Sequence, residues 1–221
     1  MTRPWPWALA GVAVGLIAFA PLRLALDRID AGRALAARAV TGPLWAGRLL
    51  EARLGGAAMG DLSARLSAPA LLGGAVEARL AGAAGTGVVV LHRDGGGVKA
   101  LSARLDPLLA AAGAPVARAQ SAGLIALFTR GRCIRAGGRL TVTLGPPIPS
   151  AADLAGEARC DGDAVLLPLS GPSGEALTLR VRADRGFTAE LRLPAADPAA
   201  LTALGFAPAP GGAALRVEGR L

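Results

Sequence analysis

Few side chains in this sequence could take part in catalysis or bind a metal, and they lie far apart. The sequence contains one histidine, His92. A single histidine cannot form a histidine-based zinc site, and its position before Arg93-Asp94 is typical of the polar end of a strand. A Ser-His-Asp triad would need this histidine, but the sequence has no G-x-S-x-G segment to present a serine. We therefore predict that the protein is not an enzyme.

Three further groupings could bind a ligand, and each has an ordinary structural explanation. Asp161 and Asp163 flank a glycine, so their carboxylates could bind a cation, but Asp-Gly-Asp at a strand start usually forms a turn. Lys99 does not follow the glycine loop of a nucleotide site. The glycines at 82, 85 and 87 lack the strand–helix context of a dinucleotide fingerprint. We expect no cofactor and no metal.

The two cysteines, Cys133 and Cys160, are the one pair of side chains that could stabilise the fold by a covalent bond. An exported domain would join them in a disulfide, whereas two unpaired buried thiols would explain the same count. A bridge would close a loop of about 28 residues. In the chain-entropy description, such a loop contributes roughly 3.5 kcal/mol to stability.

The charge of the sequence is strongly basic, with a formal net charge of +8. Of its 24 basic residues only Lys99 is a lysine, and the arginines are dispersed, as at Arg180 and Arg182. Nucleic-acid binding requires clustered charge and stacking aromatics, and aromatic residues make up only 3% here. The composition therefore excludes nucleic acid as a partner and favours a surface that faces solvent or lipid headgroups.

The elements that position these residues are predicted to be mainly β, forming a curved antiparallel sheet. Apolar residues alternate with polar ones in the C-terminal third, which is the pattern of strands with one buried face. These residues are Leu140, Val142 and Leu144; Val165, Leu167 and Leu169; and Leu177, Leu179 and Val181. Other strands are predicted at 47–54, 60–66, 76–80, 88–91, 98–105, 191–193 and 215–217. Two short helices are predicted after Asp106-Pro107 and after Asp197-Pro198.

An uncharged run from Pro4 to Leu22 predicts a transmembrane anchor. As a helix it would span about 28 Å, close to the thickness of the bilayer core. The alternative is a signal peptide cleaved after Ala18-Phe19-Ala20, but the run exceeds the usual apolar region of about 7–15 residues. We therefore expect a cytoplasmic N-terminus at 1–3, an anchor at 4–22, a juxtamembrane linker or polar helix at 23–41, and a β-rich domain at 42–221.

The orientation of this anchor is ambiguous from charge. Only Arg3 precedes the run, whereas four arginines follow it within 23–38, so a count of positive charges would place the domain in the cytoplasm. The even number of cysteines outside the anchor favours export instead.

Two segments near the start of the β-rich region resemble type II secretion system protein N. The first, 42–47, contains Gly42, Trp45 and Gly47; the second, 66–74, contains Pro69, Leu72 and Gly74. The ending is similar too, with Cys160 before a hairpin pair, then Asp197-Pro198, Leu204-Gly205-Phe206 and Gly219. Trp45 would equally suit an ordinary aromatic residue of the core.

The resemblance implies a single-pass inner-membrane protein with a periplasmic domain, acting as an accessory part of the machine that exports folded proteins. It implies inner-membrane secretion subunits as partners, with lipid around the anchor, and leaves the oligomeric state open. No catalytic or ligand residue is implied. The alternative is a periplasmic lipid-handling protein of the AsmA-like or lipopolysaccharide-export type. That alternative requires Leu140, Val142, Leu177 and Leu179 to face an open groove, not a packed interior.

Overall fold

The structure is a computed structural model that describes residues 35–54, 57–106, 109, 116–146, 148, 152–194 and 198–220. The predicted anchor at 4–22 lies outside the described residues, as does most of the helix predicted after Asp106. Within these ranges, no helix combines the length and the hydropathy needed to span a bilayer.

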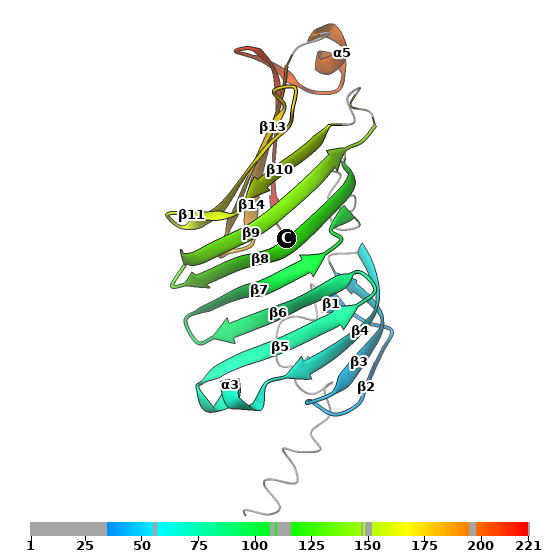
Figure 1. The fold of residues 1–221 in the computed structure, drawn as a ribbon, viewed down its shortest axis with the longest axis vertical. Coiled ribbons are helices and arrows are strands. Elements are labelled where there is room, and N and C mark those ends of the chain that lie inside the picture. Colours follow the sequence, from blue (N-terminus) through cyan, green and yellow to red (C-terminus); the bar gives the residue numbers. More distant parts are fainter. Residues whose placement is uncertain are drawn as a thin grey trace, which may run out of the picture.

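A single antiparallel sheet of 16 strands makes up nearly all of the described chain, which confirms the mainly β prediction (Figure 1). The strands are β1 (Leu35–Ala36), β2 (Ala39–Thr41), β3 (Gly47–Leu54), β4 (Ala57–Leu66), β5 (Ala75–Gly82), β6 (Gly85–His92), β7 (Gly95–Ala103), β8 (Val116–Thr129), β9 (Arg132–Leu144), β10 (Asp153–Glu157), β11 (Arg159–Asp161), β12 (Ala164–Ser170), β13 (Ala176–Arg182), β14 (Gly186–Pro194), β15 (Ala207–Ala209) and β16 (Gly212–Arg220).

The order of strands in the sheet follows the order of the chain almost throughout. From β3 to β9, each strand pairs with the strand before it and the strand after it, and β10 pairs with β9 and β12. The short strands β1 and β2 both pair with β3, β11 pairs only with β12, and β15 pairs with the first residues of β16. The result is a meander whose contacts are mostly between sequence neighbours.

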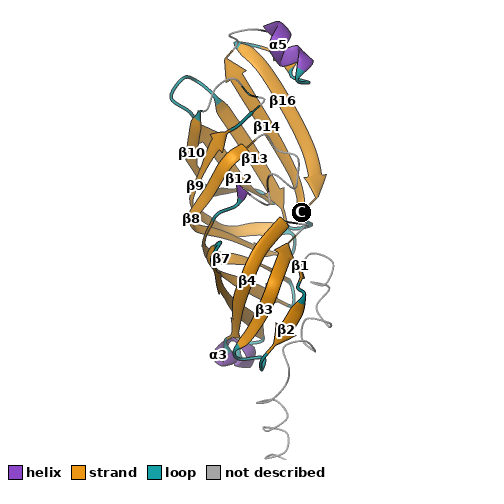
Figure 2. Ribbon diagram, turned by 90° about the vertical axis from the view of Figure 1, so that its right-hand side faces the viewer, coloured by secondary structure: helices purple, strands orange, loops and turns teal. Residues whose placement is uncertain are grey.

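The sheet is curved, and both of its ends turn toward the same side (Figure 2). The middle strands β7–β9 form the base of the curve, and β2–β4 and β13–β16 bend away from them toward the same side, which lies behind β7–β9 in Figure 1. This shape gives the sheet a concave face and an outer face.

The main hydrophobic core lies on the concave face of the C-terminal half. Alternation places one set of apolar residues on this face, and the strand register then aligns them in rows. One row runs through Leu169, Leu177, Leu191 and Leu215, and the next runs through Leu167, Leu179, Ala189 and Val217. Leu140, Val142, Val165 and Leu167 are each at most 4% exposed. The predicted alternation of these strands is confirmed.

A second, smaller core lies between the N-terminal strands. Leu49 and Ala52 of β3 and Leu62 and Ala64 of β4 are buried there. Val40 of β2 packs against this cluster, as does Ala37.

The linker prediction for 23–41 is wrong for its last residues. β1 and β2 pair with β3, with Val40 opposite Leu49 and Ala36 opposite Arg53. Strands of two and three residues are too short for alternation to be recognised, and their pairing depends on β3 rather than on their own sequence.

Strand β8 was not predicted, although it is the longest in the sheet. Its sequence, VARAQSAGLIALFT, contains mostly small residues and a register shift near Gly123, so alternation is hard to read. The same kind of interruption at Gly137-Gly138 hid the first half of β9, which begins at Arg132 instead of Leu140. The short β10 was missed as well.

Some glycine-rich stretches belong to strands and extend them beyond the predicted bounds, as residues 95–97 do in β7. The turn between β6 and β7 is only Arg93-Asp94, and β7 starts at Gly95. A side chain at Gly95 would meet the carbonyl of Phe128 in β8, which explains why glycine lies in a strand here. Glycine at this position marks a close approach of two backbones.

Two short helices lie within the described residues. The helix after Asp197-Pro198 is confirmed as α5 (Pro198–Ala203). Helix α3 (Ala68–Leu72) was not predicted; it connects β4 to β5 and begins with Pro69 in its first turn. Of the helix predicted after Asp106, only Asp106 and Leu109 are described, and both are helical.

Candidate functional site

Cys133 of β9 and Cys160 of β11 form a disulfide, with their Cα atoms 5.5 Å apart. The bond lies beyond the end of the ladder between β9 and β10. β10 pairs with the second half of β9, through residues such as Leu154 opposite Val142. The Ala158 N–H still donates to the Gly138 carbonyl. β11 then pairs in the ladder only with β12, but it stays beside β9, because the Cys133 N–H donates to the Gly162 carbonyl at 3.3 Å and the disulfide joins the two strands.

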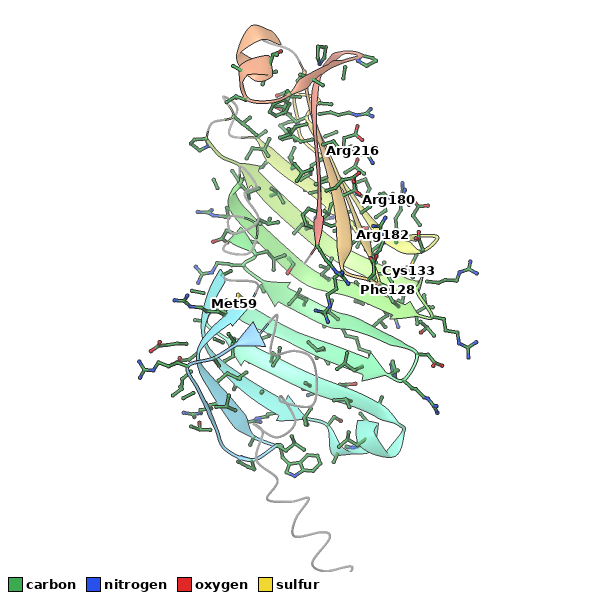
Figure 3. All side chains as sticks on the ribbon, turned by 180° about the vertical axis from the view of Figure 1, so that it is seen from behind. Met59, Phe128, Cys133, Arg180, Arg182 and Arg216 are labelled. Carbon is green, nitrogen blue, oxygen red and sulfur yellow. A yellow bond between two sulfur atoms is a disulfide. The ribbon has the colours of Figure 1, made fainter. Side chains whose placement is uncertain are left out.

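The two sulfur atoms lie between the core and the surface. Cys133 is partly buried and packs against the main core, opposite Phe128 of β8 (Figure 3). Cys160 is exposed, and its neighbour Asp161 forms an ion pair of 2.9 Å with Arg180 of β13. β11 is therefore held by a ladder, a covalent bond and a charge pair, although it has only three residues.

The first family-like segment forms the turn between β2 and β3. Gly42 has a φ of +87°, and a Cβ atom there would lie 2.7 Å from the Ala46 carbonyl oxygen, so the turn requires glycine. The Ala46 N–H closes the turn on the Pro43 carbonyl. Trp45 lies half-buried within this turn, and Gly47 is buried at the start of β3.

The second family-like segment forms α3 and the turn after it. Pro69 is exposed in the first turn of the helix, and Leu72 is its last residue. The backbone then reverses at Gly74, which has a φ of +74° and donates its N–H to the Leu71 carbonyl. Glycine adopts this left-handed conformation at little cost.

The structure brings these two segments to one end of the N-terminal strands. Gly47 starts β3 opposite Ala64, and β4 ends two residues later at Leu66, where α3 follows. The turn before β3 and the helix after β4 therefore lie at the same end of neighbouring strands (Figure 1). Their motif residues shape backbone turns and present no group for chemistry.

Comparison with protein families identifies the family of this chain. The model of the family described as "Type II secretion system (T2SS), protein N" matches residues 33–216, which is most of the chain. The chain belongs to the type II secretion system protein N family. No curated protein and no solved structure shows significant similarity to it. This finding confirms the resemblance and links this protein N family member to type II secretion.

The polar residues considered for chemistry are separated in this protein N family member. His92 is exposed at the end of β6, opposite Gly95. Lys99 pairs with Glu77 at 3.4 Å, and Asp161 is engaged by Arg180. Across the described residues, no three metal-binding side chains come together.

One carboxylate has a clearly altered acidity. The pKa of Asp184 lies below its ordinary value, first because the Gly186 N–H donates to the carboxylate at 2.9 Å. The positive charge of Arg182 lowers the pKa further. Asp184 therefore stabilises the turn between β13 and β14, as an Asx turn does.

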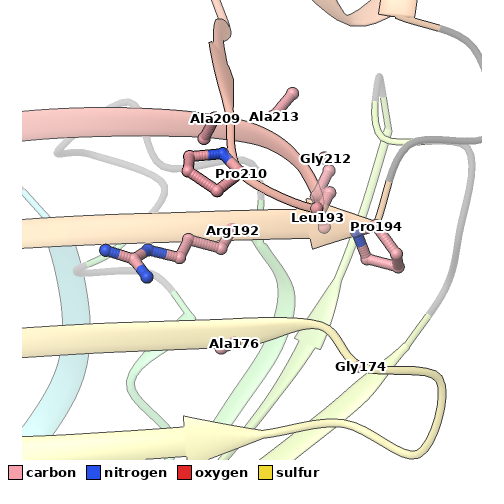
Figure 4. A pocket seen from close by; sticks show the side chains of 10 residues that line it. Gly174, Ala176, Arg192, Leu193, Pro194, Ala209, Pro210, Gly212 and Ala213 are labelled. Atoms are coloured by element: carbon pink, nitrogen blue, oxygen red, sulfur yellow. The ribbon is translucent and has the colours of Figure 1, made fainter.

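A shallow depression lies beside the turn between β15 and β16 (Figure 4). Its volume is about 140 Å³, and its wall includes Arg192, Pro194 and Pro210. Ligand pockets usually have volumes of about 300–1,000 Å³. Arg192 is already paired with Glu190 at 2.6 Å, so this depression offers no free charged group to a ligand.

Exposed apolar side chains could not be located from the sequence pattern. Ile134 is 61% exposed at a register shift in β9, next to the disulfide, and Val217 of β16 is 40% exposed. Alternation in a sequence shows which residues share a face, but not where along a row a face stops being covered.

Proposed function

We propose that this protein is a non-catalytic accessory component of the type II secretion machinery. In this proposal it is anchored in the inner membrane by residues 4–22, and its sheet acts as a periplasmic scaffold for other subunits. The observation that carries the proposal is the family match over residues 33–216.

The absence of an enzymatic role in this proposal rests on how the polar side chains are used. Among the described residues, the carboxylates near basic groups are engaged in surface ion pairs, such as Arg139 with Glu157 and Arg192 with Glu190. His92 has no acid or nucleophile opposite it in the ladder. We therefore assign no reaction to these side chains in the proposed role.

A periplasmic location is supported by the disulfide. Disulfides persist in oxidising compartments such as the periplasm and are rare in the cytosol. A bond between Cys133 and Cys160 therefore favours export over the orientation suggested by the count of positive charges.

The scaffold role is favoured over lipid handling by the packing of the leucine rows. Leu140 and Val142 are 4% and 1% exposed, and the partly buried Leu177 and Leu179 pack against the same cluster. A groove for acyl chains would leave these side chains open, whereas here they fill the interior between strands.

The experiment that tests the proposal is deletion of the gene in its native host, followed by measurement of folded exoproteins released from the cell. We expect release to fall, and a plasmid copy to restore it. A copy that lacks residues 4–22 should fail to restore release, because the scaffold would lose its position. Undiminished secretion in the deletion strain would contradict the proposal.

A further inference from the structure

Two arginines lie directly opposite each other on the outer face of the N-terminal strands. Arg65 of β4 and Arg79 of β5 are cross-strand partners, and both are exposed. Their Cβ atoms are therefore separated by about 4.5–5.5 Å, a distance at which like charges destabilise a sheet. An anion placed between them would remove this repulsion.

A third arginine completes the group. Arg48 of β3 lies opposite Ser63, which is two residues before Arg65 on β4. Diagonal neighbours of this kind are about 7–8 Å apart, so the three guanidinium groups can reach one ligand surface. We name Arg48, Arg65 and Arg79 the arginine triad.

The nearby carboxylates are engaged elsewhere. Glu77, two residues before Arg79, pairs with Lys99 on β7. Asp61, two residues before Ser63, accepts the backbone N–H of Glu51. Asp61 keeps its negative charge and is a diagonal neighbour of Arg48 on this face, but no ion pair joins the triad to a carboxylate among the residues that the structure describes. Three arginines beside one unpaired carboxylate leave an excess of positive charge here.

The side chains next to the arginines on this face are small, so the guanidinium groups project beyond them. Ser63 and Ala81 form the row beside Arg65 and Arg79, and both have small side chains. The apolar residues of these strands, such as Leu62 and Leu80, alternate with this row and therefore lie on the opposite, core-facing side. Arginines above small residues on a sheet face suit an extended, flat anionic surface better than a compact ligand.

Guanidinium groups bind phosphate oxygens in a bidentate manner, and basic residues near an anionic bilayer are attracted to it. We propose that the arginine triad binds the phosphate headgroups of anionic phospholipids, so that this face of the sheet rests on the membrane. The inference rests on the proposed anchoring in the inner membrane. Residues 23–34, between the proposed anchor and β1, can span at most about 40 Å, which keeps β3–β5 within reach of the bilayer.

A fluorescent label near the triad tests this contact directly. Neither cysteine is free, so Ala81→Cys introduces a single reactive thiol on the triad's face. The full-length labelled protein is reconstituted into phosphatidylcholine vesicles, with or without phosphatidylglycerol, that carry a headgroup quencher. We expect strong quenching only with phosphatidylglycerol, and loss of that quenching at high salt.

Variants assign the effect to the triad. Arg65→Gln with Arg79→Gln should weaken the lipid contact by about fivefold for each arginine removed. The matched control is Arg118→Gln with Arg135→Gln, which removes two exposed arginines from β8 and β9 and should leave quenching unchanged. A label at Gln120, exposed on β8, should be quenched less than a label at position 81.

Several results would overturn the inference. Quenching that is equal in phosphatidylcholine alone, or unaffected by the double variant, would show that the triad does not bind headgroups. If poly-glutamate shields the label and phosphatidylglycerol does not quench it, the ligand is an acidic protein segment. Flotation with phosphatidylcholine vesicles reports separately on the anchor, so failure of anchoring is distinguishable from failure of the triad.

Stability gives an independent readout. In detergent at low salt, Arg65→Gln should raise the melting temperature, because it removes a like-charge pair, whereas a structural arginine would lower it. Adding phosphatidylglycerol should raise the melting temperature of the wild type more than that of the variant. The opposite pair of results would contradict an anion site.

Discussion

At the scale of single residues, the disulfide is the interaction with the largest expected effect. Replacing both Cys133 and Cys160 by serine should lower the free energy of unfolding by roughly 3.5 kcal/mol, because a closed loop in the unfolded chain is released. Urea unfolding of the full-length protein in detergent measures this change. Thiol labelling after denaturation should require a reductant, and labelling without one would contradict the bond.

Gly42 provides a second test at this scale. Gly42→Ala should destabilise the protein by at least about 1–2 kcal/mol, because the left-handed backbone and the close Ala46 carbonyl both oppose a Cβ atom. Gly73→Ala is the matched control. Gly73 has a φ of −82°, and a Cβ atom there would make only an ordinary contact. Equal losses in the two variants would argue against the special role of Gly42.

The protonation state of Asp184 should make the stability of the turn between β13 and β14 depend on pH. Its pKa is lower in the folded state than in the unfolded chain, so its stabilising contribution is present above about pH 4. That contribution disappears as the pH falls through the lowered pKa. Asp184→Asn should therefore make stability slightly less dependent on pH in this acidic range. Unfolding midpoints measured from neutral to acidic pH would reveal the difference.

At the scale of elements, residues of a single cross-strand row range from buried in the core to exposed at the sheet edge. Leu167 and Val217 belong to the same row, but Leu167 is 3% exposed and Val217 is 40% exposed. Leu167→Ala should cost about 2–5 kcal/mol, because it leaves a cavity in a packed interior. Val217→Ala should cost far less, as for other surface substitutions. Similar losses would mean that the edge of the sheet is covered in solution.

The strands differ in how well they could be predicted from the sequence. Rows with large aliphatic residues, such as those through Leu169 and Leu177, were predicted because their alternation with polar residues is strong. Strand β8 was missed because alanine and glycine fit either face of a sheet, and the three-residue strand β11 was missed because it depends on pairing with β12. The arginine triad likewise arises from the register between β3, β4 and β5, which no local pattern contains.

At the scale of the whole molecule, the expectation concerns placement in the cell. A reporter that is active only in the periplasm, fused after Leu221, should be active, and the protein should remain in the membrane after a carbonate wash. The fusion should become inactive if residues 1–22 are removed. A reporter signal from the cytoplasm would support the count of positive charges instead.

The proposed scaffold role also predicts which surfaces contact lipid or other protein subunits. Photo-reactive residues at Leu140 or Leu167 should capture no lipid, because these positions are enclosed by packed strands. The same probe at Arg180, on the exposed side of β13, should capture secretion subunits in the native host (Figure 3). Crosslinks from Leu140 to phospholipid, with secretion intact, would reverse the choice between scaffold and lipid handler.

The chain-ordered sheet has a consequence for how the molecule bears load. Since β16 pairs with β14, and β14 with β13, tension on the C-terminal end would break the ladders one hydrogen bond at a time, like a zipper. Peeling of this kind needs little force, because the bonds never share the load. It would travel strand by strand to Cys160, where the covalent bond passes the tension directly to Cys133 and so on toward β8. The disulfide thus shields the loop between the two cysteines, which contains most of β9 and all of β10, from being extended until the bond is reduced.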